Sequence, residues 1–267
     1  MANIPLILHI PHASTHIPPE VRPTLLPDDN QLAAEVLSYT DMYTDELFSA
    51  YTASFASAVA FPVNRLVVDP ERFPDDNEEP MASHGMGAVY LRMLDGSPLR
   101  NPLHQGERQK LLDTYYFPHH QRLTRRVEQQ LAEAGSCLII DCHSLPEHPF
   151  PFEANKSRVR PEICIGTDSF HTPAALSGIA AEIFREAGYT VDYNHPFSGT
   201  LVPLQYYQQA PRVFSLMIEI NRKCYMDEKT GHKHGGFTVL QRQLPGILQL
   251  IQKAAGKSVY DCIPAGN

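Results

Sequence analysis

Histidines and carboxylates recur in this sequence directly after short apolar runs. The four that we single out are His12, Asp69, His143 and Glu219. Because open α/β sheets keep their sites at the carboxyl ends of their strands, these positions predict one shared site. Two imidazoles and a carboxylate suit a zinc ion with an open coordination position, and a further carboxylate can take the proton from the water that zinc activates. The residue types therefore indicate metal-dependent hydrolysis.

The segment Asp141-Cys142-His143-Ser144 follows the apolar run at residues 137–140. The run, together with the Pro-broken loop after this segment, predicts a buried parallel strand that delivers polar side chains at its carboxyl end. Because side chains alternate along a strand, Asp141 and His143 share a face, where the carboxylate can orient the imidazole. On this tetrapeptide alone, a histidine at a loop edge with satisfied hydrogen bonds explains the pattern equally well.

Histidines elsewhere in the sequence compete for the same site. We favour His12 over His9, since a residue just past a strand's end is free to point into a cleft. His119 and His120 are expected on the surface of a helix, although a kink at Pro118 could turn one of them toward the site.

Apolar patterns with strand and helix periods alternate along the chain, which predicts an α/β fold with a mixed, mostly parallel sheet flanked by helices. Expected strands cover residues 5–10, 58–61, 65–68, 137–140, 162–167, 190–193 and 213–220. Expected helices cover residues 29–39, 43–55, 107–134 with a break at Pro118, 172–187 and 236–255. No internal repeat or linker divides the 267 residues, so we expect a single catalytic domain over residues 1–267.

The composition favours a cytoplasmic protein that acts on a small molecule. The formal net charge is −8 without a polybasic run, which argues against nucleic-acid and anionic-membrane partners. No charged leader with a long apolar run is present, so we expect neither secretion nor a membrane span. The five cysteines are an odd number without C-x-x-C spacing and are expected to be reduced, whereas thirteen histidines favour metal binding.

Other enzyme classes lack their motifs in this sequence. No serine stands in a G-x-S-x-G elbow, and neither a Walker loop nor a G-x-G-x-x-G loop is present. These absences argue against a serine hydrolase, a P-loop enzyme and a dinucleotide-binding enzyme.

Several segments together resemble the N-formylglutamate amidohydrolase family, in that family's order and over nearly the whole chain. They are Pro11-His12-Ala13-Ser14, residues 64–72, Asp141-Cys142-His143-Ser144, residues 194–199, and Glu219 with Tyr225-Met226. The resemblance implies a three-layer fold like that of the zinc carboxypeptidases. It also implies zinc-dependent hydrolysis of the amide bond of N-formyl-L-glutamate to formate and L-glutamate, in histidine degradation.

The chain departs from the family pattern beside one motif. The family usually shows Ser before Arg65 and Leu-Asn between Asp69 and Arg72, where this chain has Asn64 and Pro70-Glu71. These departures bear on the specificity for the acyl group or the amino acid more than on the chemistry.

His12, Asp41 and His143 are the expected ligands of Zn²⁺ or of another divalent transition metal. The resemblance favours Asp41 over Asp45, because the family's matching segment carries Asp at the former. Asp69 is the rival third ligand if Asp41 serves only as a helix cap.

Glu219 is the expected general base. A carboxylate at the end of an apolar strand is costly unless it is paired or functional. Resemblance to the zinc carboxypeptidases places their catalytic glutamate at this strand exit, where it deprotonates the activated water and passes the proton to the leaving amine. The alternative is an ion pair with Arg222 or Lys223.

An N-acyl glutamate carries two carboxylates, which guanidinium groups bind in a planar, two-bonded way. The expected substrate-binding residues are Arg65, Arg72, Asn194, Gly199 and Thr200, with Arg222 a further candidate. The expected supporting residues behind the site are Asp69, Asp141 and Ser144. For each arginine the alternative is a surface ion pair.

Two other functions compete with this hypothesis. One is a zinc amidohydrolase or peptidase for another N-acyl amino acid, which the departures at Asn64 and Pro70-Glu71 keep open. The other is a non-catalytic metabolite-binding relative, which would be expected to lack the base or a ligand. Turnover of N-formyl, N-acetyl and N-succinyl amino acids distinguishes the three.

Overall fold

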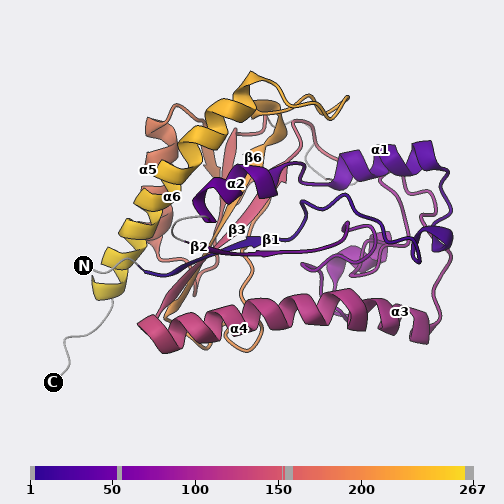
Figure 1. Cartoon of the computed structure of the whole chain (residues 1–267), viewed down its shortest axis with the longest axis horizontal. Coiled ribbons are helices and arrows are strands. Elements are labelled where there is room, and N and C mark those ends of the chain that lie inside the picture. The colour runs from indigo at the N-terminus through magenta and orange to yellow at the C-terminus, as the bar shows by residue number, and fades with distance from the viewer. Residues whose placement is uncertain (1–3, 53–55, 152, 154–158, 262–267) are drawn as a thin grey trace.

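The computed structural model of the chain describes residues 4–52, 56–151, 153 and 159–261. Within these residues six strands form one sheet in the order β2-β1-β3-β6-β4-β5. The strands are β1 (Leu6–Ile10), β2 (Ala56–Ala60), β3 (Cys137–Leu145), β4 (Ile163–Gly166), β5 (Val191–Tyr193) and β6 (Val213–Asn221). Only β4 and β6 pair antiparallel. The predicted mixed, mostly parallel α/β sheet is therefore confirmed (Figure 1).

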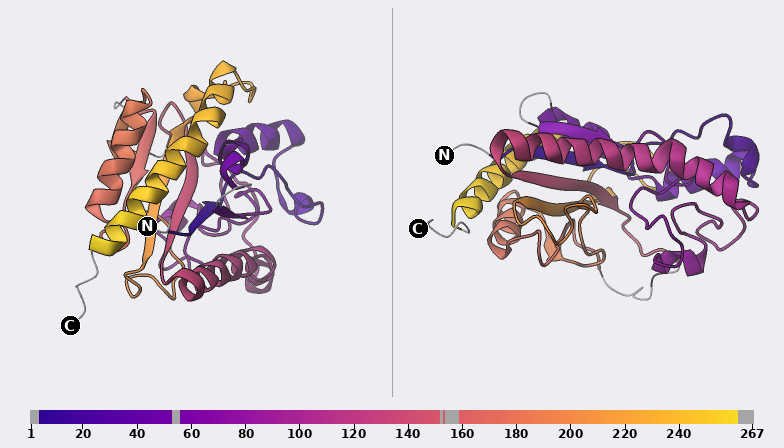
Figure 2. Two further views of the ribbon diagram at one scale, coloured as in Figure 1. Left: turned by 60° about the vertical axis from the view of Figure 1, so that its left-hand side comes forward. Right: turned by 90° about the horizontal axis from the view of Figure 1, so that it is seen from below.

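Helices cover both faces of the sheet, which gives three layers (Figures 1 and 2). On one face lie α2 (Thr44–Thr52), α5 (Ala174–Glu186) and α6 (Gly235–Asp261), and on the other lies α4 (Phe117–Ala134). Beyond the carboxyl ends of β1 and β3 lie α1 (Asp29–Tyr39) and α3 (Gln105–Leu111). Four short helical turns are η1 (Arg22–Thr24), η2 (Pro80–His84), η3 (Leu112–Tyr116, π-helical) and η4 (Arg222–Cys224).

Alternation along β3 divides the core between the two faces. Leu138 and Ile140 pack with α2, α5 and α6, whereas Ile139 packs toward α4 against Leu123 and Val127. Each fully buried aliphatic side chain of this kind contributes about 1.5–3 kcal/mol of transfer free energy. The same alternation places the odd-numbered residues at the end of β3, including His143, on the α4 side of the sheet.

The strand predicted at residues 65–68 is wrong. The segment is a turn in which the N–H of Val67 donates to the carbonyl of Asn64, and the N–H of Leu66 donates to the Asn64 side chain. Leu66 and Val67 are both fully buried but belong to different core clusters. The aliphatic run therefore reflects burial on two sides of a turn, and Asp69 follows a loop rather than a strand.

Two other boundaries refine the predicted elements. β3 extends to Leu145, so Asp141 and His143 lie inside the strand rather than after it. Pro118 lies in the first turn of α4, behind the π-helical turn η3, which agrees with the predicted break in a long helix. Residues 53–55 at the end of the helix predicted over 43–55 lie outside the described residues.

The cysteines and the helices bear on two further expectations. Cys137, Cys142, Cys164 and Cys224 are free, and Cys262 lies outside the described residues. Among the described helices, none is both long enough and apolar enough to cross a membrane.

Candidate active site

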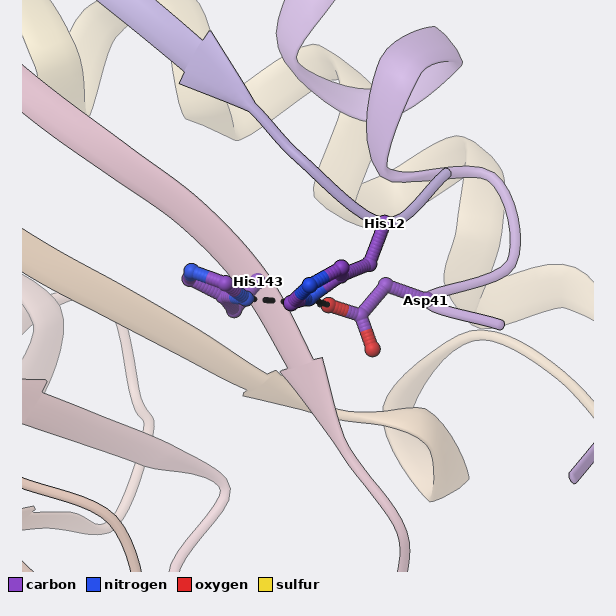
Figure 3. A group of neighbouring side chains, drawn as sticks. All are labelled: His12, Asp41 and His143. Atoms are coloured by element: carbon purple, nitrogen blue, oxygen red, sulfur yellow. Dashed lines mark hydrogen bonds and ion pairs between the residues drawn. The ribbon is translucent and has the colours of Figure 1, made fainter. Parts of the chain in front are cut away.

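Three side chains from distant parts of the chain converge at the carboxyl ends of β1 and β3 (Figure 3). His12 lies just past β1, Asp41 follows α1, and His143 belongs to β3. One nitrogen of each histidine and one oxygen of Asp41 lie within 4.8 Å of one another. The N–H of Asp41 donates to the carbonyl of His12 at 3.0 Å, which ties the two loops together. All three residues are buried.

The spacing of these atoms fits a tetrahedral metal ion. Asp41 Oδ2 lies 3.1 Å from His143 Nδ1 and 3.6 Å from His12 Nδ1. Ligand atoms about 2.0–2.1 Å from a tetrahedral zinc ion lie roughly 3.3 Å apart. His12 Nδ1 is buried without a hydrogen-bond partner, which leaves its lone pair for a metal ion. Two imidazoles and a carboxylate are also a donor set that catalytic zinc takes when one position stays open.

Asp69 contacts the other nitrogen of His12. Its Oδ1 accepts from His12 Nε2 at 2.8 Å, and its Oδ2 accepts from Arg65 at 2.7 Å and from the Tyr90 hydroxyl at 2.8 Å. Because Nε2 of His12 carries the proton in this hydrogen bond, Nδ1 is left bare and faces Asp41. This is the geometry of a carboxylate that orients a metal-binding histidine.

Arg222 supports Asp41 from behind. One of its terminal nitrogens lies 3.3 Å from Asp41 Oδ1, and its Nε donates to the Ser144 hydroxyl at 3.1 Å. The other terminal nitrogen donates to the carbonyl of Ser38 at 2.7 Å. Arg222 is only 3 % exposed, so it does not form the surface ion pair that we considered. The predicted supporting residue Ser144 thus reaches Asp41 through this guanidinium.

Glu219 lies beside His143 on the neighbouring strand. The two are register partners in the parallel ladder between β3 and β6, so their side chains share a face. Glu219 is 5 % exposed, and its Oε2 has no hydrogen-bond partner. Within the described part of the chain no lysine or arginine forms an ion pair with it; Arg222 pairs with Asp41 instead. Burial raises the pKa of Glu219 to about 7, which suits a group that takes and returns a proton.

The carboxylates around His12 and His143 raise the pKa of each histidine by more than burial lowers it. Burial by itself would lower the pKa of His143, but Glu71, Asp141 and Asp41 hold it well above its usual value of 6.5. The pKa of His12 is likewise raised, against burial and Arg65, by Asp69 and Asp41. The site therefore carries excess negative charge and favours a cation, either a proton or a metal ion.

A second cluster, which no sequence pattern predicted, lies on the far side of His143. Atoms of His9, Glu71 and Asp141 lie within 4.8 Å of one another. His9 Nδ1 lies 2.7 Å from Asp141 Oδ1, and Glu71 Oε2 lies 3.1 Å from His143 Nε2. His9 faces Asp141 because the two are register partners in β1 and β3. No local pattern in the sequence pairs them, since strand register arises from the fold.

His119 is fully buried rather than on a helix surface as expected. Its Nε2 lies 2.9 Å from His9 Nε2. His119 precedes Leu123 and Val127 by four and eight residues, and the three form the buried stripe of α4. This helical spacing is the signal that would have predicted its burial.

The two predicted substrate-binding arginines differ in how fully their donors are used. Arg65 donates to Asp69 Oδ2 from Nε at 3.1 Å and from a terminal nitrogen at 2.7 Å. Arg72 lies 3.8 Å from Asp69 and 3.9 Å from Glu79, and its Nε has no hydrogen-bond partner. Its side chain is 29 % exposed. Arg72 is therefore the more available of the two for a ligand carboxylate.

Asn194 and Thr200 use their polar side chains in hydrogen bonds to neighbouring segments, at Thr167 after β4 and at Ser215 in β6. The Asn194 amide accepts from the N–H of Thr167 at 2.9 Å and donates to its hydroxyl at 2.8 Å. The Thr200 hydroxyl lies 2.6 Å from that of Ser215. Both predicted substrate-binding side chains thus shape the loop after β5 in this structure.

Gly199 belongs to the same loop and has a φ of +91°, a conformation that glycine adopts readily. A Cβ atom added at Gly166 would lie 2.3 Å from the carbonyl oxygen of Gly199, so the two backbones are in close contact. Two residues further on, the N–H of Leu201 donates to Asp141 Oδ2 at 2.9 Å. This backbone hydrogen bond connects the loop to the second cluster.

The fold and the site together define an α/β protein with a histidine–carboxylate cluster at the carboxyl ends of parallel strands and a buried glutamate on the adjacent strand. The family model FGase, N-formylglutamate amidohydrolase, matches residues 4–226. The chain belongs to this family of hydrolases, as the resemblance implied. The matched range contains every residue of the site described above.

Individual relatives agree with the family. The N-formylglutamate deformylases of Pseudomonas aeruginosa and Pseudomonas putida are 28 % and 27 % identical to this chain, and each match covers 85 % of it and 84 % or 83 % of the relative. The crystal structure of an N-formylglutamate amidohydrolase from Ralstonia eutropha JMP134 has a TM-score of 0.82 at 25 % identity, over 96 % of this chain and 95 % of that one. Gene product Atu2144 from Agrobacterium tumefaciens shares the fold, with a TM-score of 0.67 at 21 % identity over 97 % and 93 %.

Proposed function

We propose that this chain hydrolyses the amide bond of N-formyl-L-glutamate to formate and L-glutamate, in histidine degradation. The observation that carries the proposal is the His12–Asp41–His143 donor set beside a buried Glu219, in a chain of this family. The names of the two Pseudomonas relatives support the choice of substrate.

His12, Asp41 and His143 would hold a zinc ion or another divalent transition metal. When bound there, the metal would polarise the formyl carbonyl and lower the pKa of a water molecule. Both oxygens of Asp69 are already engaged by His12, Arg65 and Tyr90, which supports Asp41 as the third ligand.

Glu219 acts as the base. Its carboxylate removes a proton from the attacking water as the water oxygen bonds to the formyl carbon, and it returns that proton to the amide nitrogen as the carbon–nitrogen bond breaks. The unpartnered Oε2 and the pKa near neutrality support this assignment. A cation held by the neighbouring ligands would favour the charged form of Glu219 and bring its pKa back down from about 7.

Arg72 binds a carboxylate of the substrate. Its Nε has no hydrogen-bond partner, and its two acidic neighbours, Asp69 and Glu79, lie beyond normal hydrogen-bond distance. Arg65 contributes mainly by holding Asp69, and through it the ring of His12.

A substrate screen tests the function directly. Zinc-loaded protein is assayed for acid release from N-formyl, N-acetyl and N-succinyl derivatives of glutamate and of a neutral amino acid. We expect N-formyl-L-glutamate to show the highest kcat/KM, and Glu219→Gln serves as the matched control with the same shape and no basicity. Absence of turnover on every compound, with zinc fully loaded, would reject hydrolysis and leave a metabolite-binding protein.

Glu71 favours a second candidate function, hydrolysis of a different N-acyl amino acid or peptide. This carboxylate is 20 % exposed and lies 3.1 Å from His143. The negative charge of Glu71 would repel an anionic substrate group placed beside it. If this second function is correct, a derivative of the neutral amino acid has a higher kcat/KM than N-formyl-L-glutamate in the same screen.

A further inference from the structure

His143 is the side chain from which this inference begins, because only one of its two ring nitrogens is used by the site proposed above. Nδ1 faces Asp41 at 3.1 Å. Nε2 lies 3.1 Å from Glu71 Oε2 and 3.2 Å from Asp141 Oδ1, yet neither contact is aligned as a hydrogen bond, and Nε2 is a buried polar atom without a partner. His143 is 4 % exposed, so water does not readily replace the missing partner.

His9, Glu71 and Asp141 beside Nε2 form a second group of possible metal ligands, with one atom of each within 4.8 Å of the others. His9 Nδ1 lies 2.7 Å from Asp141 Oδ1 and 3.7 Å from Glu71 Oε1. Together with the two contacts of His143, the four distances span 2.7–3.7 Å. Donor atoms around one tetrahedral ion lie roughly 3.3 Å apart and point at the ion rather than at each other. This arrangement explains why the two short contacts of His143 Nε2 are not aligned hydrogen bonds. The contact between His9 and Asp141 is an aligned hydrogen bond.

The charges in this cluster also call for a cation. Asp141 is 1 % exposed, and in the described ranges neither Asp141 nor Glu71 forms an ion pair with a lysine or an arginine. Two carboxylates therefore face Nε2 of His143 without a lysine or arginine ion pair among the described residues. Leaving buried carboxylates without a counter-charge is costly, and a cation bound between them removes that cost.

We infer that His9, Glu71, Asp141 and Nε2 of His143 form a second site for a divalent transition metal. With both ions bound, the ring of His143 releases its remaining N–H proton to solvent and bridges the two ions as an imidazolate. The bridge rests on the metal site of the proposed function, whereas the second donor set stands on its own contacts. Glu71 is the one partly exposed member, at 20 %, and gives the ion a route from solvent.

A hydrogen-bonded chain behind His9 supplies the competing explanation. Arg122 contacts His119 Nδ1 at 3.4 Å, His119 contacts His9 Nε2 at 2.9 Å, and His9 contacts Asp141 at 2.7 Å. If each residue donates a proton to the next in that order, His9 donates from Nδ1 to Asp141 and is only a structural support for it. Metal binding requires the opposite tautomer of His9, with its proton on Nε2 and directed at His119.

The experiment measures metal bound per chain. Full-length wild type, His9→Gln, Glu71→Gln and His12→Gln are loaded with Zn²⁺, dialysed against metal-free buffer and analysed by inductively coupled plasma mass spectrometry, and anomalous diffraction at the zinc edge locates the ions. The controls are His120→Gln, a histidine next to His119 outside both donor sets, and Asp76→Asn, a carboxylate paired with Arg108. Circular dichroism and the melting temperature of each metal-free variant report its fold.

We expect about two zinc ions per chain in wild type and in both controls, and about one in each of the three variants. Because His9 is fully buried, its substitution can perturb the fold; Glu71→Gln, at a partly exposed position, then carries the test. About one ion in wild type, lost in His12→Gln but kept in His9→Gln and Glu71→Gln, would overturn the inference and leave the proposed function standing. One ion kept in His12→Gln and lost in Glu71→Gln would support the second site and overturn the metal assignment of the proposed function. No bound metal in wild type would overturn both.

Discussion

His143 and Glu219 are register partners in the parallel ladder between β3 and β6, with their side chains on the same face of the sheet. Neighbouring strands lie about 4.8 Å apart, so backbone hydrogen bonds rather than a loop set the separation of the two residues. A proposed ligand and the proposed base are thereby held on β3 and β6, the two central strands of the sheet. Substitutions at either residue should change chemistry or metal binding with little rearrangement of the backbone.

Glu219→Gln should lower kcat by about 10²–10⁴-fold, because it removes the base while preserving the shape of the side chain. Steady-state kinetics on the best substrate of the screen measure the loss. Zinc content and substrate affinity should stay close to wild type, since Glu219 is not among the proposed ligands. A variant that kept more than about a tenth of the wild-type kcat would make Glu219 structural and direct attention to Asp69 or Asp141.

Asp41→Asn and Asp69→Asn should separate a ligand from its support. Asp41→Asn should remove the zinc ion held with His12, because the amide is a poor replacement for the carboxylate. Asp69→Asn should keep the ion but weaken its binding by about 10–100-fold, because it loosens the ring of His12. Chelator competition gives both affinities. Loss of the ion in Asp69→Asn, with only weakened binding in Asp41→Asn, would make Asp69 the third ligand.

Arg72→Lys should lower kcat/KM on N-formyl-L-glutamate by at least about tenfold, a loss of roughly 1.4 kcal/mol, because an ammonium group cannot form the planar pair with a carboxylate. Arg108→Lys, at an arginine paired with Asp76 away from the site, is the matched control. Equal kinetics for Arg72→Lys and the control on acidic substrates would exclude Arg72 from substrate binding.

Two histidines near the site should make the fold sensitive to acid. Burial lowers the pKa of His119 and lowers that of His120 to about 4. In the unfolded chain both titrate near 6.5, so below about pH 6.5 the unfolded state takes up protons that the folded state does not. The free energy of unfolding should then fall by up to about 1.4 kcal/mol per pH unit for each histidine, down to about pH 4 for His120.

Urea unfolding of metal-free protein between pH 7.5 and pH 5 measures this slope. His120→Gln can keep a hydrogen bond to the Pro70 carbonyl. This variant should reduce the slope of the unfolding free energy against pH by the contribution of His120. His148→Gln, at a side chain that is 87 % exposed, serves as the control. An unchanged slope in His120→Gln would show that this residue titrates alike in both states.

Several features followed from local sequence alone. The helix expected over residues 29–39 has those bounds in the structure, because Asp28 and Gln31 form a capping box at its start. The alternation of strand and helix periods correctly predicted a mostly parallel α/β sheet. His12, His143 and Glu219 were recognisable because each stands where an apolar run meets polar residues, which is a property of neighbouring residues only.

Tertiary structure decided which of these side chains meet. His9 faces Asp141 because β1 and β3 pair in one register, and no pattern within either strand encodes that choice. Glu71 reaches His143 because residues 64–72 form a turn and loop, although their aliphatic run has the composition of a strand. Local periodicity reports which residues are buried and in which element. Pairing between segments more than a hundred residues apart depends on how whole faces pack, and that packing places His143 between two sets of possible metal ligands.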